Sequence, residues 1–186
     1  SNLFFDWYLP SLLNKKNSKK IEDKLKRILS RVYSKLNLPN GCLVHRDYHA
    51  DNLMKIKGRI GVIDSQDALI GNPAYDLVSL VDDVRIKTSF KLKNQICDYY
   101  LKKAKIKGIA RKKFINDFDI LSVQRSLKII GIFSRLFIRD KKNRYLKLIP
   151  YTWKILEKRM ESEIFLELRK ILEKNISKNT RNKIIN

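Results

Sequence analysis

The 186-residue sequence is short of the residues that mark several protein classes. It has only two cysteines, Cys42 and Cys97, without C-x-x-C spacing, which argues against a disulfide scaffold or a cysteine-rich zinc module. Glycine is scarce, and neither G-x-G-x-x-G nor the Walker pattern G-x-x-x-x-G-K-[ST] occurs. No apolar run approaches the roughly 18 residues of a membrane span, and no signal-peptide pattern opens the chain. We therefore expect reduced thiols, a cytoplasmic location and no membrane partner.

Acidic residues are also few: 19 against 41 lysines and arginines, which gives a formal net charge of +22. Such a charge can indicate a nucleic-acid or anionic-lipid partner, or simply lysine-rich solvated surfaces. The basic residues are mostly lysines, spread along the chain rather than gathered with aromatic residues into a stacking platform. We favour the second explanation and expect no nucleic-acid partner.

Apolar periodicity predicts a mostly helical α+β domain over residues 1–174, followed by a basic polar tail over 175–186. We expect apolar residues 3–13 to be core, and a short strand at 43–44. Strands 53–56 and 60–63 should form a β-hairpin around Lys57 and Gly58. Asn72 and Pro73 suit the start of a helix that runs to about residue 85. The other helices are expected at 18–36, 89–106, 112–139, 150–159 and 162–173.

The central motif is H-x-D-x-x-x-x-N, formed by His45, Asp47 and Asn52, with Asp64 following an apolar run. In protein kinases this spacing supplies an Asp that takes the proton of the attacking hydroxyl, and an Asn and a second Asp that bind Mg²⁺. A tight loop and a hairpin would carry these oxygen-bearing side chains to one place. We therefore interpret the segment as a phosphoryl-transfer site that uses ATP and Mg²⁺.

Two other interpretations remain open for this segment. His45, Asp47, His49 and Asp51 alternate, which is a pattern that zinc or hydrolase sites can show. The chain has no third histidine, and neither cysteine has metal-ligand spacing, which weakens that hypothesis. The other is an inactive remnant that serves a structural purpose.

A kinase also needs a nucleotide cover, and the sequence does not contain one. The Gly-rich loop and strand lysine of kinases precede the H-x-D motif, but only 44 residues precede His45 here, and they predict helix. We expect the chain to be a kinase-like C-terminal lobe, whose partner is an N-terminal nucleotide-binding lobe of the same protein. Such a lobe alone should be inactive.

Residues 43–54 and 63–80 together resemble the aminoglycoside phosphotransferase and choline kinase superfamily. Within it, the chain is most similar to the bacterial cell-wall amino-sugar kinases, and residues 124–146 resemble their late helix. The resemblance implies transfer of phosphate from ATP to the anomeric hydroxyl of N-acetylmuramate or N-acetylglucosamine in peptidoglycan recycling. It makes Asp47 the catalytic base and Asn52 and Asp64 the Mg²⁺ ligands.

The resemblance further implies that His45, Arg46 and Asp76 support the catalytic loop. Asp76 has an alternative role in the first turn of a helix, where its charge favours the helix dipole. The candidates for the acceptor pocket are Asp51, Gln66, Asp67, Gln124 and Arg125. Two functional alternatives stay open: a kinase for an aminoglycoside, choline or a thiosugar, and a non-catalytic basic binding protein on a kinase-like lobe.

Overall fold

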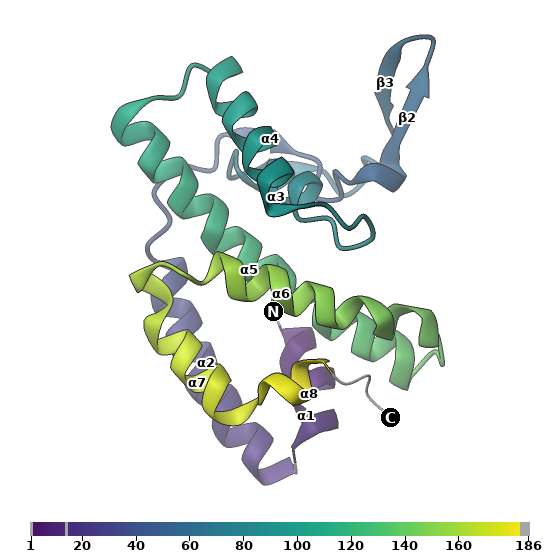
Figure 1. The fold of residues 1–186 in the computed structure, drawn as a ribbon, viewed down its shortest axis with the longest axis vertical. Helices are drawn as coiled ribbons and strands as arrows, with labels where there is room; N and C mark the ends of the chain where they lie inside the picture. Colours follow the sequence, from purple (N-terminus) through teal and green to yellow (C-terminus); the bar gives the residue numbers. More distant parts are fainter. Residues whose placement is uncertain (1, 14, 183–186) are drawn as a thin grey trace. The chain divides into compact units, whose positions relative to one another are not determined.

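The computed structural model describes residues 2–13 and 15–182, which divide into two compact units (Figure 1). Unit 1 comprises residues 1–35 and 123–186, and unit 2 comprises residues 36–122. Helix α5 (Gly108–Ile138) contributes residues to both. The H-x-D-x-x-x-x-N motif and Asp64 lie in unit 2, so this unit holds the expected chemistry.

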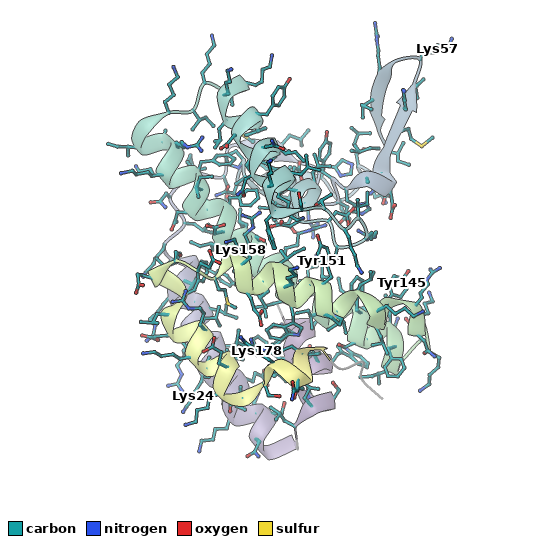
Figure 2. The ribbon with its side chains drawn as sticks, viewed as in Figure 1. Lys24, Lys57, Tyr145, Tyr151, Lys158 and Lys178 are labelled. Carbon is teal, nitrogen blue, oxygen red and sulfur yellow. The ribbon has the colours of Figure 1, made fainter. Side chains whose placement is uncertain are left out.

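Unit 2 has two small antiparallel sheets and three helices. Strands β1 (Cys42–Val44) and β4 (Leu69–Gly71) form a ribbon, and β2 (Leu53–Ile56) pairs with β3 (Arg59–Val62). The predicted hairpin is confirmed. Its two turn residues, Lys57 and Gly58, have positive φ values of 44° and 79°, as a type I′ turn requires. The hairpin projects from the unit, with Lys57 at its tip (Figures 1 and 2).

The helices of unit 2 build its apolar core. They are α3 (Tyr75–Val81), α4 (Phe90–Lys103) and the first part of α5. Ser89 caps α4, since its hydroxyl accepts a hydrogen bond from the backbone N–H of Leu92 at 3.2 Å. The buried apolar side chains that pack together are Ala74, Leu77, Val78, Val81, Cys97, Leu101, Phe114, Phe118 and Leu121.

Two features differ from the prediction: strand β4 was not expected, and α3 ends earlier than expected. The helix that follows Asn72 stops at Val81 rather than near residue 85, because the next carboxylate turns into the interior. Asp82 accepts a hydrogen bond from the Ser122 hydroxyl at 2.7 Å and lies 3.4 Å from the ammonium of the fully buried Lys93. Pairing the two charges and bonding them offsets the cost of burying them.

Unit 1 is helical. A short π-helix, η1 (Phe4–Tyr8), leads into α1 (Leu9–Leu12), and α2 (Lys15–Tyr33) follows. After α5 come η3 (Asn143–Leu148), α6 (Ile149–Arg159), η4 (Glu163–Phe165), α7 (Leu166–Asn175) and α8 (Lys178–Asn182). α7 packs against α2, and α8 packs against α6. The predicted helices are confirmed with shifts of a few residues at their ends. Among the helices of the described residues, none combines the length and apolarity of a membrane span.

The first apolar segment is core, as expected. Phe4, Tyr8 and Leu9 are buried, and the indole N–H of Trp153 donates to the Tyr8 hydroxyl at 2.9 Å. The described part of the expected tail is packed as well: Arg181 is buried, stacks over the Trp153 ring at 4.8 Å, and bonds Glu157 at 2.6 Å. The segment after residue 175 thus helps to cover the aromatic core of unit 1.

At Gly131 two backbone segments of unit 1 lie very close together. A Cβ at this position of α5 would collide with backbone atoms of Leu3 and Phe4. Backbone cannot move aside as a flexible side chain can, so only glycine lets the first segment lie against α5.

We predict that Gly131→Ala lowers the free energy of unfolding by about 3 kcal/mol, because the added methyl overpacks this contact. Urea unfolding of the chain would measure the change. Gly41→Ala is the matched control, since a Cβ at Gly41 meets nothing within 4 Å. A Gly131→Ala variant as stable as the Gly41→Ala variant would contradict the close approach.

We also predict a specific alkaline sensitivity that originates at Tyr8. Burial raises the pKa of Tyr8 to about 12 against an ordinary value of 10.0, although the bond from Trp153 acts in the opposite direction. Between these two pH values the phenol ionises in the unfolded chain and stays neutral in the folded one. Stability is therefore lost as pH rises, by about 1.4 kcal/mol per pH unit.

Tyr8→Phe removes this titration together with one hydrogen bond worth about 1 kcal/mol. The variant should be less stable than the wild type at pH 8, and the gap should shrink or reverse at pH 11.5. Urea unfolding of both proteins at the two pH values tests this. A gap that is the same at both would show that Tyr8 does not titrate differently in the folded state.

Candidate functional site

The site is built around the carboxylate of Asp76 in the first turn of α3. Its two oxygens accept the backbone N–H groups of His45 at 2.7 Å and Arg46 at 3.0 Å. Arg46 has a φ of 74°, a left-handed conformation that is uncommon for a residue with a Cβ. The Ser79 hydroxyl donates to the Arg46 carbonyl at 3.4 Å. Bonds on both sides of Arg46 thus hold the segment directly before Asp47 in a strained conformation.

Asp47 and Asn52 are joined by a tight loop. The carbonyl of Asp47 accepts the backbone N–H of His49 at 3.0 Å and the side-chain Nδ2 of Asn52 at 2.9 Å. The turn η2 (Ala50–Asn52) closes the loop. Because Nδ2 is the atom bonded to the loop, Oδ1 of Asn52 is the atom left to act as a ligand.

Asp64 reaches the same frame through the hairpin. The N–H of Ile63 donates to the Asn52 carbonyl at 3.1 Å, which extends the β2–β3 pairing by one residue. Nε2 of His45 lies 2.9 Å from the Ile63 carbonyl. Asp64 follows with a φ of 66°, a second left-handed residue that is not glycine. Two contacts of the Ile63 backbone therefore tie the residue directly before Asp64 to the loop that carries Asp47 and Asn52.

The donor set fits a magnesium ion. Mg²⁺ prefers carboxylate and carbonyl oxygens and keeps part of its water shell, so one or two protein ligands suffice. Asn52 offers Oδ1. Asp64 is exposed, and its Oδ1 accepts a hydrogen bond from Gln66, so Oδ2 is available. Asp47 is a half-buried carboxylate beside them in the chain, and a carboxylate can accept a proton from a hydroxyl.

The zinc interpretation finds no ligand set in the part of the chain that the structure describes. No three side chains of the types His, Cys, Asp or Glu gather there as potential ligands. The ring of His45 is instead in contact with the Ile63 carbonyl, and His49 is buried. Asparagine is not one of these four residue types, so the pair Asn52 and Asp64 is still available for a magnesium ion.

The predicted pocket residues of unit 2, Asp51, Gln66 and Asp67, each make a contact with another polar residue. Asp51 is exposed and lies 3.2 Å from Nε of Arg85, whose Nη1 lies 3.1 Å from the buried Asp83. Nη1 of Arg46 donates to the Asp67 carbonyl at 3.3 Å. Arg85 was not expected from the sequence, because nothing in its local pattern separates it from other surface arginines. Gln124 and Arg125 belong to unit 1 and remain predictions.

Comparisons with known proteins identify similar sequences. The phosphotransferase enzyme family matches residues 1–113, which include Asp47, Asn52, Asp64 and Asp76. Three curated relatives are named N-acetylmuramate/N-acetylglucosamine kinase. The one from Neisseria meningitidis is 36% identical over 153 residues, the one from Pseudomonas aeruginosa 39% over 160, and the one from Caulobacter vibrioides 34% over 142.

These alignments cover 80%, 83% and 74% of this chain but only 46%, 47% and 39% of the respective relatives. The chain therefore spans about half the length of the curated relatives it matches. Residues 1–113, which the family matches, include both parts of the candidate site: the loop that follows β1 and the hairpin that leads to Asp64. This chain belongs to the phosphotransferase enzyme family.

Proposed function

We propose that the protein transfers the γ-phosphoryl group of ATP to the anomeric hydroxyl of N-acetylmuramate or N-acetylglucosamine. The observation that carries the proposal is the hydrogen-bonded frame in which Asp76, the loop and the hairpin hold Asp47, Asn52 and Asp64. The family match supports phosphoryl transfer, and the names of the relatives support an amino-sugar acceptor. Such an activity would belong to peptidoglycan recycling in the cytoplasm.

In this mechanism Asp47 acts as the general base. The acceptor hydroxyl attacks the γ-phosphorus, and its proton passes to a carboxylate oxygen of Asp47. The bond from the γ-phosphorus to the bridging oxygen breaks, and ADP leaves with that electron pair. Little covalent help is needed, because positioning and charge stabilisation supply most of the rate in phosphoryl transfer.

Asn52 and Asp64 would hold the Mg²⁺ that accompanies ATP. A bound Mg²⁺ neutralises negative charge on the phosphates. The protein's own contribution is to keep the two ligands fixed: Asn52 through its bond to the Asp47 carbonyl, and Asp64 through the hairpin and Gln66. The acceptor would lie near Asp51, Gln66 and Asp67, with Gln124 and Arg125 as further candidates.

We further propose that another region of the protein covers the nucleotide. Apolar side chains next to the site in unit 2 are exposed: Leu43 by 74%, Ile60 by 62% and Ile70 by 63%. The curated relatives are about twice as long as the matched segment. A nucleotide-binding N-terminal lobe would bury such surface, and this chain alone should then turn over little or no ATP.

The proposal is tested by ADP release from the complete native protein with Mg²⁺-ATP and a panel of acceptors. N-acetylmuramate and N-acetylglucosamine are compared with choline, a thiosugar and an aminoglycoside, and this chain is assayed in parallel. Turnover that depends on the amino sugars supports the proposal. Turnover on another acceptor alone would keep phosphoryl transfer and reject the amino sugar. Salt-sensitive nucleic-acid binding without any turnover would favour a non-catalytic basic protein.

In the complete protein we predict that Asp47→Ala lowers kcat by about 10²–10⁴-fold, the usual contribution of a general base. The loop's hydrogen bonds are accepted by the backbone carbonyl of Asp47 rather than by its carboxylate. Alanine retains this carbonyl. Thermal unfolding should therefore change little. Steady-state kinetics with saturating sugar measures the effect, and Asp23→Ala, at an exposed carboxylate on α2 outside the candidate site, is the control. Retained kcat in Asp47→Ala would remove the proposed base.

For the metal we predict that Asp64→Asn weakens Mg²⁺-dependent ATP binding by at least about tenfold, because a charged ligand is replaced by a neutral one. Titration calorimetry with ATP, with and without Mg²⁺, isolates the metal-dependent part. ATP affinity in the absence of Mg²⁺ should stay close to that of the wild type. Equal Mg²⁺ dependence in the two proteins would show that Asp64 is not a ligand.

A further inference from the structure

Asp117 is a fully buried carboxylate on α5 in unit 2. Its Oδ1 accepts from the backbone N–H of Asn37 at 2.8 Å, from Nδ2 of Asn37 at 3.2 Å and from Nδ2 of Asn116 at 3.3 Å. Its Oδ2 accepts from the backbone N–H of Leu38 at 2.9 Å and from Nδ2 of Asn72 at 2.8 Å. Within the described residues no lysine or arginine is paired with it, so these donors compensate the buried charge.

Apart from Asn116, the donors flank the two strands of one antiparallel ribbon at the same end of it. Asn37 and Leu38 precede β1, and Asn72 directly follows β4. Those strands pair from Cys42 opposite Gly71 to Val44 opposite Leu69. Asp117 therefore fixes both chain segments where the ribbon begins, and β1 runs from there into the loop at His45.

Asn72 also continues the connection into α3. Its Oδ1 accepts the backbone N–H of Ala74 at 3.0 Å, and its carbonyl accepts the N–H of Tyr75 at 3.0 Å. The next residue is Asp76, which holds the N–H groups of His45 and Arg46. Two routes, one through β1 and one through α3, thus lead from Asp117 to the residues that precede Asp47.

We propose that Asp117 is a positioning residue for phosphoryl transfer, acting through β1 and through Asn72 and Asp76 on the loop of Asp47. The inference rests on the proposed function for its effect on rate. Asp117 itself is buried and touches no reacting group. Its loss should displace the base while the nucleotide contacts elsewhere stay intact, and a misplacement of about 1 Å can cost about 10²-fold in rate.

The test is Asp117→Asn, which keeps the shape of the side chain but turns one acceptor oxygen into a donor that faces N–H groups. In the complete protein we expect kcat to fall about 10-fold to 10²-fold with the KM for ATP unchanged. In this chain without substrate we expect faster backbone hydrogen exchange at residues 45–48, measured under conditions where both proteins are folded. The second readout does not depend on activity.

Ser122→Ala is the matched control. It lies on the same helix and also removes a buried hydrogen bond, the 2.7 Å bond to Asp82, but this bond does not lead to the ribbon. It should lower the free energy of unfolding while kcat of the folded enzyme and exchange at 45–48 stay unchanged. A swap, Asp117→Asn with Asn72→Asp, restores one charged bond between the two positions and should recover part of kcat.

Exchange at 45–48 that stays at the wild-type rate in folded Asp117→Asn would overturn the proposal, and so would an equal loss of kcat in Ser122→Ala. Asn72→Ala provides a milder break of the same connection for the case in which Asp117→Asn does not fold, with the same readouts. If the wild-type protein transfers no phosphoryl group, the proposed function fails, and the exchange measurement still decides whether Asp117 holds the loop.

Discussion

The site depends on one carboxylate that accepts two consecutive backbone N–H groups. Asp76 fixes His45 and Arg46, and this hold keeps Arg46 in a left-handed conformation that isolated chain would avoid. Charged hydrogen bonds of this kind are among the stronger ones in proteins. The direction in which Asp47 leaves the loop follows from the backbone before it. The helix dipole of α3 offers Asp76 a favourable position, but its contribution is small beside these two bonds.

Much of the fold could be predicted from periodicity and turn chemistry. The long amphipathic stripe of α2 and the Lys57-Gly58 turn are local signals, and both led to the observed elements. β4 was not predicted because Leu69–Gly71 is only three residues long and is a strand only through its pairing with β1. The end of α3 was misplaced for a similar reason: Asp82 turns inward toward Ser122 and Lys93, partners that lie far along the chain. Contacts of long sequence separation leave no local pattern.

The same division runs through the site. The spacing of Asp47, Asn52 and Asp64 predicts their roles in phosphoryl transfer. The structure joins their backbone segments by hydrogen bonds. The support behind them is less visible. Asp117 lies within helix α5 beside the polar residues Asn116 and Asp119, and four of its five acceptor contacts come from segments about 45 and 80 positions away. No local sequence pattern distinguishes Arg85 either, although its guanidinium forms ion pairs with both Asp51 and Asp83.

The β2–β3 hairpin carries a consequence for the behaviour of the protein in solution. Within the described part of the chain, β2 and β3 pair only with each other, so each strand has one unpaired edge. The side chains of Ile56 and Ile60 on these strands are exposed. Open edges of this kind template strand addition between molecules. Lys55, Lys57 and Arg59 are exposed on the same hairpin, and a molecule with a formal charge of +22 repels its copies. Salt screens this repulsion over a Debye length of about 8 Å at physiological ionic strength. Colloidal stability should therefore be greatest in dilute buffer, the reverse of salting in.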